Sequence, residues 1–244
     1  MGTNNSDINE LQELEKRFAA IKETIAGCPR FNPEQEVELI VVSKGQNVEK
    51  IRRFHQLGQK RFGENYLQEL QSKSEALRDL PIEWVFIGHL QSNKIKKIVE
   101  YAAEIQTVAS LKHAAAIAQA ARTFGRTPYP IYLAINADEE EGKNGVNFAE
   151  LLPLYEQIAQ QFADELHVMG IMAVPSADYT HYADDAEVPA IYQKLRRVAD
   201  QIGEAKLSLG MSGDLKIAIR AGSNLVRIGT ALMGERSQNT RLKP

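Results

Sequence analysis

Lys44 has the sequence context of an amine that could form a Schiff base. It directly follows the apolar, β-branched run 39–43, which is typical of a buried strand. Burial lowers the pKa of a lysine amine, which suits it to condensation with an aldehyde. Position alone favours the alternative of a solvated lysine that opens a loop, because lysine is seldom fully buried.

Two turns near the C-terminus could bind a phosphate group. Gly229 and Thr230 directly follow one predicted strand, and Ser212 directly follows another. A glycine lets the backbone approach an anion, a hydroxyl donates to it, and the first amides of a helix supply further donors. The alternative for each turn is ordinary helix capping. Two such turns after successive strands favour a phosphate site.

Two further side chains could contribute to such a site. Arg227 precedes Gly229 by two residues and lies on the strand itself, where it could meet a ring nitrogen or a carboxylate; a structural ion pair is the alternative. His89 could act as an acid or base, but a histidine that holds a loop by hydrogen bonding is the more ordinary interpretation. No second histidine or cysteine has metal-ligand spacing from His89, so we expect no metal site.

The chain around these residues alternates short apolar runs with amphipathic helical segments. Eight strands are predicted at 39–43, 61–64, 84–88, 104–108, 130–136, 165–173, 207–211 and 225–228. Helices are predicted at 48–57, 66–77, 93–101, 111–124, 148–162, 189–202 and 214–221. One more helix, capped by Asp7, precedes the first strand. Such alternation implies an α/β fold with parallel strands and right-handed crossovers.

Two architectures satisfy this pattern, an open doubly wound sheet and a closed (β/α)8 TIM barrel. Eight units without a linker favour the barrel, and no dinucleotide-binding glycine pattern follows strand 39–43. We expect residues 1–244 to form a single domain, with residues 1–33 as an N-terminal helix and linker packed on the barrel. The candidate residues would then gather at the rim formed by the carboxyl ends of the strands.

The composition indicates a globular protein of the cytoplasm. Hydrophobic residues make up 43% and charged residues 25% of the chain, and the net charge of -3 gives no indication of nucleic-acid binding. The single cysteine, Cys28, excludes an intrachain disulfide and indicates a reducing compartment. No apolar run approaches the roughly 18 residues of a membrane helix. The first nine residues are polar and contain no signal-peptide core.

Five short motifs in fixed order resemble the YggS/PROSC family of pyridoxal 5′-phosphate (PLP) homeostasis proteins. They are VSK at 42–44, FGENY at 62–66 with QE at 68–69, IGHLQSNK at 87–94, LGMSGD at 209–214 and VRIGTALMG at 226–234. The resemblance spans roughly residues 11–236. It implies a PLP-bearing TIM barrel, similar to the N-terminal domain of fold-type III enzymes such as alanine racemase.

The resemblance implies a cofactor site and no catalytic residue. The cofactor-binding residues that it implies are Lys44, Asn65, Met211, Ser212, Arg227, Gly229 and Thr230. Lys44 would hold PLP as a Schiff base, and Arg227 would face the pyridine nitrogen and keep it unprotonated. Ser212, Gly229 and Thr230 would contact the phosphate group. The stretches GKNG at 142–145 and GSN at 222–224 depart from the family pattern. The resemblance therefore does not predict the details of the loop after the fifth strand.

The leading hypothesis for function is a non-catalytic protein that holds PLP reversibly and regulates or delivers it, with PLP-dependent apo-enzymes as possible recipients. The chain ends about ten residues after the last motif, so we expect neither the C-terminal β domain of alanine racemases nor the second base that it supplies. One alternative is a PLP-dependent amino-acid racemase or lyase, which turnover would reveal. The other is a PLP-free aldolase, which would not be yellow. We expect a monomer or weak homodimer, and neither a membrane nor a nucleic-acid partner.

Overall fold

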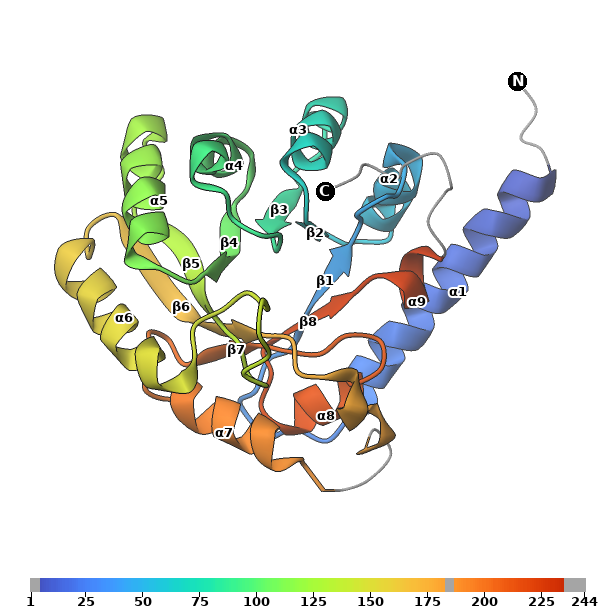
Figure 1. Cartoon of the computed structure of the whole chain (residues 1–244). Helices are drawn as coiled ribbons and strands as arrows, with labels where there is room; N and C mark the ends of the chain where they lie inside the picture. Colours follow the sequence, from blue (N-terminus) through green and yellow to red (C-terminus); the bar gives the residue numbers. More distant parts are fainter. Residues whose placement is uncertain (1–4, 183–186, 235–244) are drawn as a thin grey trace.

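Eight parallel strands close into a barrel, and helices surround it (Figure 1). The computed structural model describes residues 5–182 and 187–234, and their side chains except those of 5–11 and 180–182. Each strand pairs with its neighbours in chain order, and the last pairs with the first through Leu39 with Val226 and Ile40 with Arg227. The (β/α)8 prediction is therefore confirmed over the open sheet.

The strands lie close to their predicted positions. They are β1 Glu38–Val42, β2 Arg61–Glu64, β3 Glu83–Phe86, β4 Glu104–Val108, β5 Tyr129–Ile135, β6 Leu166–Ala173, β7 Lys206–Ser208 and β8 Leu225–Ile228. β7 is shorter than the predicted strand 207–211. Gly210 has a φ of 96°, which takes the backbone out of the extended conformation before that run is complete.

The described helices follow the predicted alternation. They are α1 Asn5–Gly27, α2 Val48–Gln56, α3 Leu67–Ala76, η1 Ser92–Lys94, α4 Ile95–Tyr101, α5 Leu111–Phe124, α6 Phe148–Gln161, η2 Ala177–Tyr182, α7 Ala190–Ala199, α8 Leu215–Arg220 and α9 Thr230–Met233. The predicted helix 93–101 is divided between η1 and α4, and Asp7 lies within α1. None of these helices is both long and apolar enough to cross a membrane.

Local sequence explains where several helices begin and end. Asn47 caps α2 by accepting a hydrogen bond from the backbone amide of Lys50 at 3.0 Å. Asn147 and Glu150 form a capping box at the start of α6. Gly125 ends α5 in the left-handed conformation that glycine adopts without steric cost. The two N-caps set the points at which α2 and α6 begin, and Gly125 sets the point at which the chain leaves α5 toward β5.

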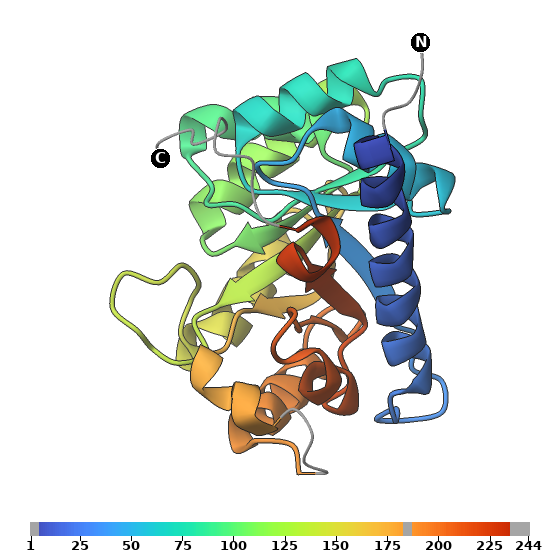
Figure 2. The ribbon, with the colours of Figure 1, turned by 90° about the vertical axis from the view of Figure 1, so that its right-hand side faces the viewer.

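Helix α1 lies along the outside of the barrel beside α8 and α9 (Figure 2). Its apolar stripe is buried at Leu14, Phe18 and Ile25. The Phe18 ring packs edge-on against Phe54 of α2, with ring centroids 5.4 Å apart. The period of three and four residues in α1 therefore supplies the apolar face that attaches it.

The interior of the barrel is divided between apolar and polar side chains. A small apolar cluster contains Ile40, Val85, Tyr132, Ala134, Met172 and Leu225. The buried polar residues are Glu104 and Gln106 on β4, Ser208 on β7 and Arg227 on β8, and only β8 also contributes to the apolar cluster. Because a buried polar group is costly unless it is hydrogen-bonded, this polar set needs internal partners.

Candidate functional site

The predicted site residues come from four strands that are consecutive neighbours in the barrel, β7, β8, β1 and β2. In this order, the strands lead to Met211 and Ser212, to Gly229 and Thr230, to Lys44, and to Asn65; Arg227 lies on β8 itself. All these strands are parallel, so their carboxyl ends open at the same rim. The topology therefore gathers the predicted residues on one half of the barrel mouth.

The turn that carries Lys44 is fixed from both sides. Lys44 is partly buried, between buried Ser43 and buried Gly45. The Ser43 carbonyl accepts a hydrogen bond of 2.7 Å from Lys73 Nζ, and the Gly45 amide donates to Glu69 Oε2 at 2.6 Å. Gly45 has a φ of 70°, which glycine adopts without strain. The backbone at Lys44 is thus held in place by the neighbouring helix α3.

A buried charge cluster lies behind this turn. Lys73 Nζ is 2.7 Å from Glu64 Oε1 and 2.6 Å from Glu69 Oε2, and the Ser43 hydroxyl donates to Glu64 Oε1 at 2.6 Å. Burial raises the pKa of Glu64, while Lys73 and Ser43 act to lower it. Glu64 Oε2 is buried without a hydrogen-bond partner among the described residues. One ammonium therefore compensates two buried carboxylates.

Arg227 is a buried cation whose described partners are neutral. Its Nη1 donates to Ser208 Oγ at 2.6 Å and its Nη2 donates to the Ala173 carbonyl at 2.9 Å. Burial lowers the pKa of Arg227 to about 10, with Asp214 and Tyr192 acting in the opposite direction. The side chain therefore stays charged at neutral pH. The predicted alternative, an ion pair with a carboxylate, is not found among the described residues.

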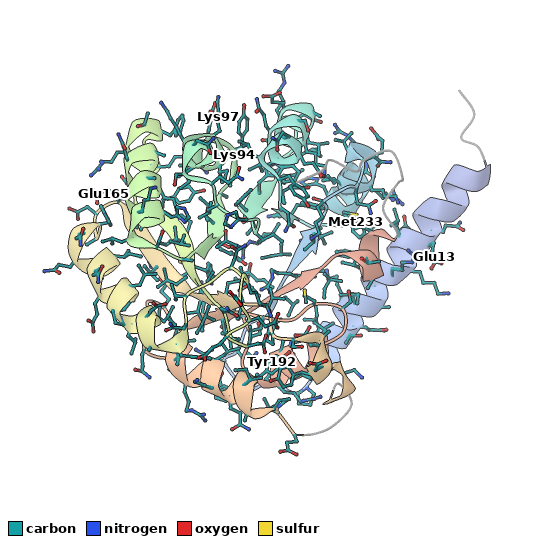
Figure 3. The ribbon with its side chains drawn as sticks, in the orientation of Figure 1. Glu13, Lys94, Lys97, Glu165, Tyr192 and Met233 are labelled. Carbon is teal, nitrogen blue, oxygen red and sulfur yellow. The ribbon has the colours of Figure 1, made fainter. Side chains whose placement is uncertain are left out.

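The two candidate phosphate turns differ in how they are held. A Cβ atom on Gly229 would lie 3.5 Å from Val42 Cβ, so the first turn packs beside the end of β1. In the second turn, Asp214 accepts from the Met211 amide at 2.6 Å and from the Tyr192 hydroxyl at 2.7 Å. Tyr192 is labelled on α7 in Figure 3. Asp214 thus closes the turn and makes no side-chain cap on α8.

The exposed groups of these turns are available to a ligand. Ser212 and Thr230 are exposed, and neither hydroxyl bonds to another described residue. Met211 is 40% exposed, which is unusual for a large apolar side chain in this protein. The turns therefore present donors and one apolar surface at the rim without internal competition for them.

Asn65 and His89 lie where the β2 and β3 ends approach each other. A side chain at Gly88 would collide with the Asn65 carbonyl, so only glycine permits this approach. Asn65 Oδ1 is buried and has no described hydrogen-bond partner. His89 is exposed and its ring bonds to no described residue, whereas the Thr107 hydroxyl donates to the Gly88 carbonyl at 2.7 Å. The prediction that His89 holds this loop is therefore not supported, and Thr107 does so.

Sequence reasoning missed two sets of residues. The cluster of Glu64, Glu69 and Lys73 could have been suspected from the i,i+4 spacing of Glu69 and Lys73 on a helix. The polar residues Gln106 and Ser208 had a weaker signal, a hydrophilic side chain inside a predicted strand. The first signal identifies the Glu69–Lys73 pair but not Glu64, and the second identifies no partner for Gln106 or Ser208.

The donor set of the rim fits a phosphorylated aldehyde such as PLP. Lys44 offers an amine, the Gly229 and Ser212 turns offer amides and hydroxyls, and Arg227 offers a buried guanidinium. The unpartnered Asn65 Oδ1 leaves one buried acceptor to satisfy. Among the side chains described, no group of three His, Cys, Asp or Glu residues could hold a metal ion.

Comparisons with known proteins give one consistent result. The family model "Alanine racemase, N-terminal domain" matches residues 11–237. The pyridoxal phosphate homeostasis protein of Pasteurella multocida is 35% identical over 230 residues, 91% of this chain and 97% of its own. The structure of PipY from Synechococcus elongatus with PLP bound matches at a TM-score of 0.75 and 29% identity, covering 91% of this chain and all of that one.

A more distant match concerns the fold alone. Alanine racemase from Bartonella henselae, with covalently bound pyridoxal phosphate, has a TM-score of 0.71 and 13% identity. The match covers 96% of this chain and 62% of that enzyme. The barrel is therefore common to both proteins.

Proposed function

The chain belongs to the family of pyridoxal phosphate homeostasis proteins, and we propose on that premise that it binds PLP at the barrel mouth and regulates or delivers it. Lys44 holds PLP as a Schiff base, and Arg227 faces the ring nitrogen. Ser212, Gly229 and Thr230 bind the phosphate group, while Asn65 and Met211 line the pocket. PLP supplies an aldehyde that condenses with amines and a ring that withdraws electrons.

The observation that carries this proposal is the position of Arg227. The cation is only 4% exposed and its described partners are neutral, on the strand that pairs directly with β1 and leads to Gly229. Because desolvating an arginine without a paired carboxylate is costly, a purely structural role explains it poorly. A ligand atom that accepts a hydrogen bond from the guanidinium gives the residue a reason to be there.

The surroundings of the site also favour holding the cofactor over turnover. A general base needs a pKa near the operating pH and a partner that orients it. Burial, together with the hydrogen bond to Asp214, raises the pKa of Tyr192, the buried tyrosine that contacts the Ser212 turn, well above its usual range. His89 is exposed and has no described group to orient it. We therefore propose that the protein has no robust catalytic activity.

Three finer points complete the proposal. PLP-dependent apo-enzymes receive the cofactor, and the exposed side chains of Tyr66 and Met211 beside the site would lie in such a contact. The protein acts in the cytoplasm, which suits the free, buried thiol of Cys28. It acts as a monomer or a weak homodimer.

Reduction with borohydride tests the proposed function directly. The purified protein loaded with PLP should gain one phosphopyridoxyl group, because borohydride reduces the Schiff base to a stable amine. Mass spectrometry of the digested protein should find the group on the peptide that contains Lys44. A label on another lysine, or the absence of any label, would overturn the assignment.

Replacing Thr230 with alanine tests the phosphate turn. The Thr230 hydroxyl is exposed at the first residue of α9 and bonds to no described residue. The loss of one hydrogen bond to a charged phosphate should weaken PLP binding by about tenfold or more. Equilibrium dialysis measures this change. Thr123→Ala is the matched control, since that hydroxyl bonds within α5, and equal affinities of the two variants would count against the turn.

A further inference from the structure

A chain of hydrogen bonds crosses the interior of the barrel from Arg227 toward the opposite rim. The Arg227 Nη1 donates to Ser208 Oγ at 2.6 Å, and this hydroxyl donates to Gln106 Oε1 at 2.8 Å. Gln106 Nε2 then donates to Glu104 Oε1 at 2.6 Å. Glu104 Oε2 accepts from Arg61 Nη2 at 2.8 Å. The chain thus connects β8, β7, β4 and β2.

The direction of each hydrogen bond in this series is fixed by the two charged residues at its ends, Arg227 and Glu104. Arginine can only donate, so Ser208 Oγ must accept from it and has its one hydrogen left for Gln106. The Gln106 amide then presents its oxygen to Ser208 and its nitrogen to the Glu104 carboxylate. The chain is therefore polarised from a cation to an anion, and each dipole stabilises the charge on Arg227.

The far end of the chain is itself compensated. Arg61 pairs with Glu104 and also with Glu38 Oε2 at 2.6 Å, near the start of β1. The Glu104 side chain is 8% exposed, and burial raises its pKa while Arg61 lowers it. The carboxylate can therefore serve two cations, Arg61 directly and Arg227 through Gln106 and Ser208.

We propose that Ser208 and Gln106 are positioning residues that keep the Arg227 guanidinium charged and aimed at the ring nitrogen of PLP. This inference rests on the proposed function, because it assumes that the cofactor binds next to Arg227. Without the Ser208 hydroxyl, Nη1 loses its acceptor, and among the described residues only the bond of Nη2 to the Ala173 carbonyl still holds the guanidinium. The position of the guanidinium at the ring nitrogen is then less well fixed. This should change both the affinity of the protein for PLP and the absorption of bound PLP.

The test compares Ser208→Ala with Ser208→Thr, which keeps a hydroxyl. Ser208→Ala should weaken PLP binding by up to about tenfold, because a less firmly held guanidinium loses part of its hydrogen bond to the ring nitrogen, and should shift the absorption maximum of bound PLP. Ser208→Thr should keep both values closer to those of the unmodified protein. Gln106→Leu should shift the same band by a smaller amount. An unchanged band and affinity in Ser208→Ala would overturn the inference.

A second background shows whether Ser208 acts through Arg227. In the Arg227→Lys protein, the further change Ser208→Ala should have no effect on the band, whereas a full additional shift would overturn the inference. In the PLP-free protein, NMR should detect a slowly exchanging Arg227 Nη proton that Ser208→Ala abolishes. If the proton persists in the variant, this would also count against the proposed role of Ser208.

Failure of this inference is separate from failure of the proposed function. Borohydride should still label Lys44 in Ser208→Ala at saturating PLP. If this label forms but Ser208→Ala has no effect on band or affinity, the proposed function stands and Ser208 does not position Arg227. If the unmodified protein takes no label on Lys44, the cofactor assignment itself fails, and the inference fails with it.

Discussion

Lys44→Ala should abolish the absorption band of bound PLP and weaken PLP binding by at least about 100-fold. The variant removes the only group at the mouth assigned a covalent bond to the cofactor, so the phosphate and ring contacts alone remain. Lys44 is only partly buried, and the interactions that fix its turn come from Ser43 and Gly45. The fold should therefore remain intact, and spectroscopy and equilibrium dialysis measure the loss.

Lys94→Ala is the matched control for this variant. Lys94 belongs to η1, which follows β3 at the same end of the barrel, and it is labelled in Figure 3. It should keep the band and the affinity, because its amine has no role in the proposed site. A retained band in Lys44→Ala, or equal losses in both variants, would contradict the assignment of Lys44.

The barrel was predictable because its signals are local. Apolar runs and amphipathic helices alternate along the whole chain, and this alternation permits few topologies. The end of β7 was not predictable in this way. Gly210 lies within an apolar run that favours a strand, yet its positive φ ends the strand early. The conformation of one glycine depends on its tertiary neighbours, among them Ala218, which the run itself does not identify.

The gathering of the candidate residues at one rim was also predictable, since parallel strands bring their carboxyl ends together. Lys44, Asn65 and Gly229 were placed there by counting strands. The interactions behind them were not. Gln106 and Ser208 are separated by 102 residues, and they meet only because β4 and β7 face each other across a closed barrel. The order of the strands along the sequence does not show which interior side chains meet across the barrel, so it gives no reason to pair these two residues.

Lys73→Met should destabilise the protein by about 3–5 kcal/mol, the cost typical of breaking a buried ion pair by removing one partner. The Lys73 side chain is 7% exposed and contacts both Glu64 and Glu69. Methionine fills a similar volume but leaves two buried carboxylates without a cation. Denaturant unfolding measures the change. Because Lys73 also holds the Ser43 carbonyl, the variant should bind PLP more weakly as well.

An exposed ion pair supplies the control for this measurement. Lys97 is 54% exposed and lies 2.8 Å from Glu100, one turn along the same helix. Lys97→Met should cost less than about 1 kcal/mol, because solvent screens such pairs. The double variant Lys73→Met with Glu64→Gln should regain part of the lost stability by removing one uncompensated charge. Equal costs for Lys73→Met and Lys97→Met would show that the buried cluster contributes no more than a surface pair.

The cost of Lys73→Met should depend on pH in a direction that identifies its cause. Burial already raises the pKa of Glu64, and Lys73 opposes that rise. Without Lys73, the folded-state pKa of Glu64 moves further above its unfolded value. A carboxyl with a raised folded-state pKa is least costly below its unfolded pKa, and stability falls as pH rises through the folded-state pKa. The difference between the variant and the unmodified protein should therefore be smaller at pH 5 than at pH 8. A packing defect alone would give the same difference at both pH values.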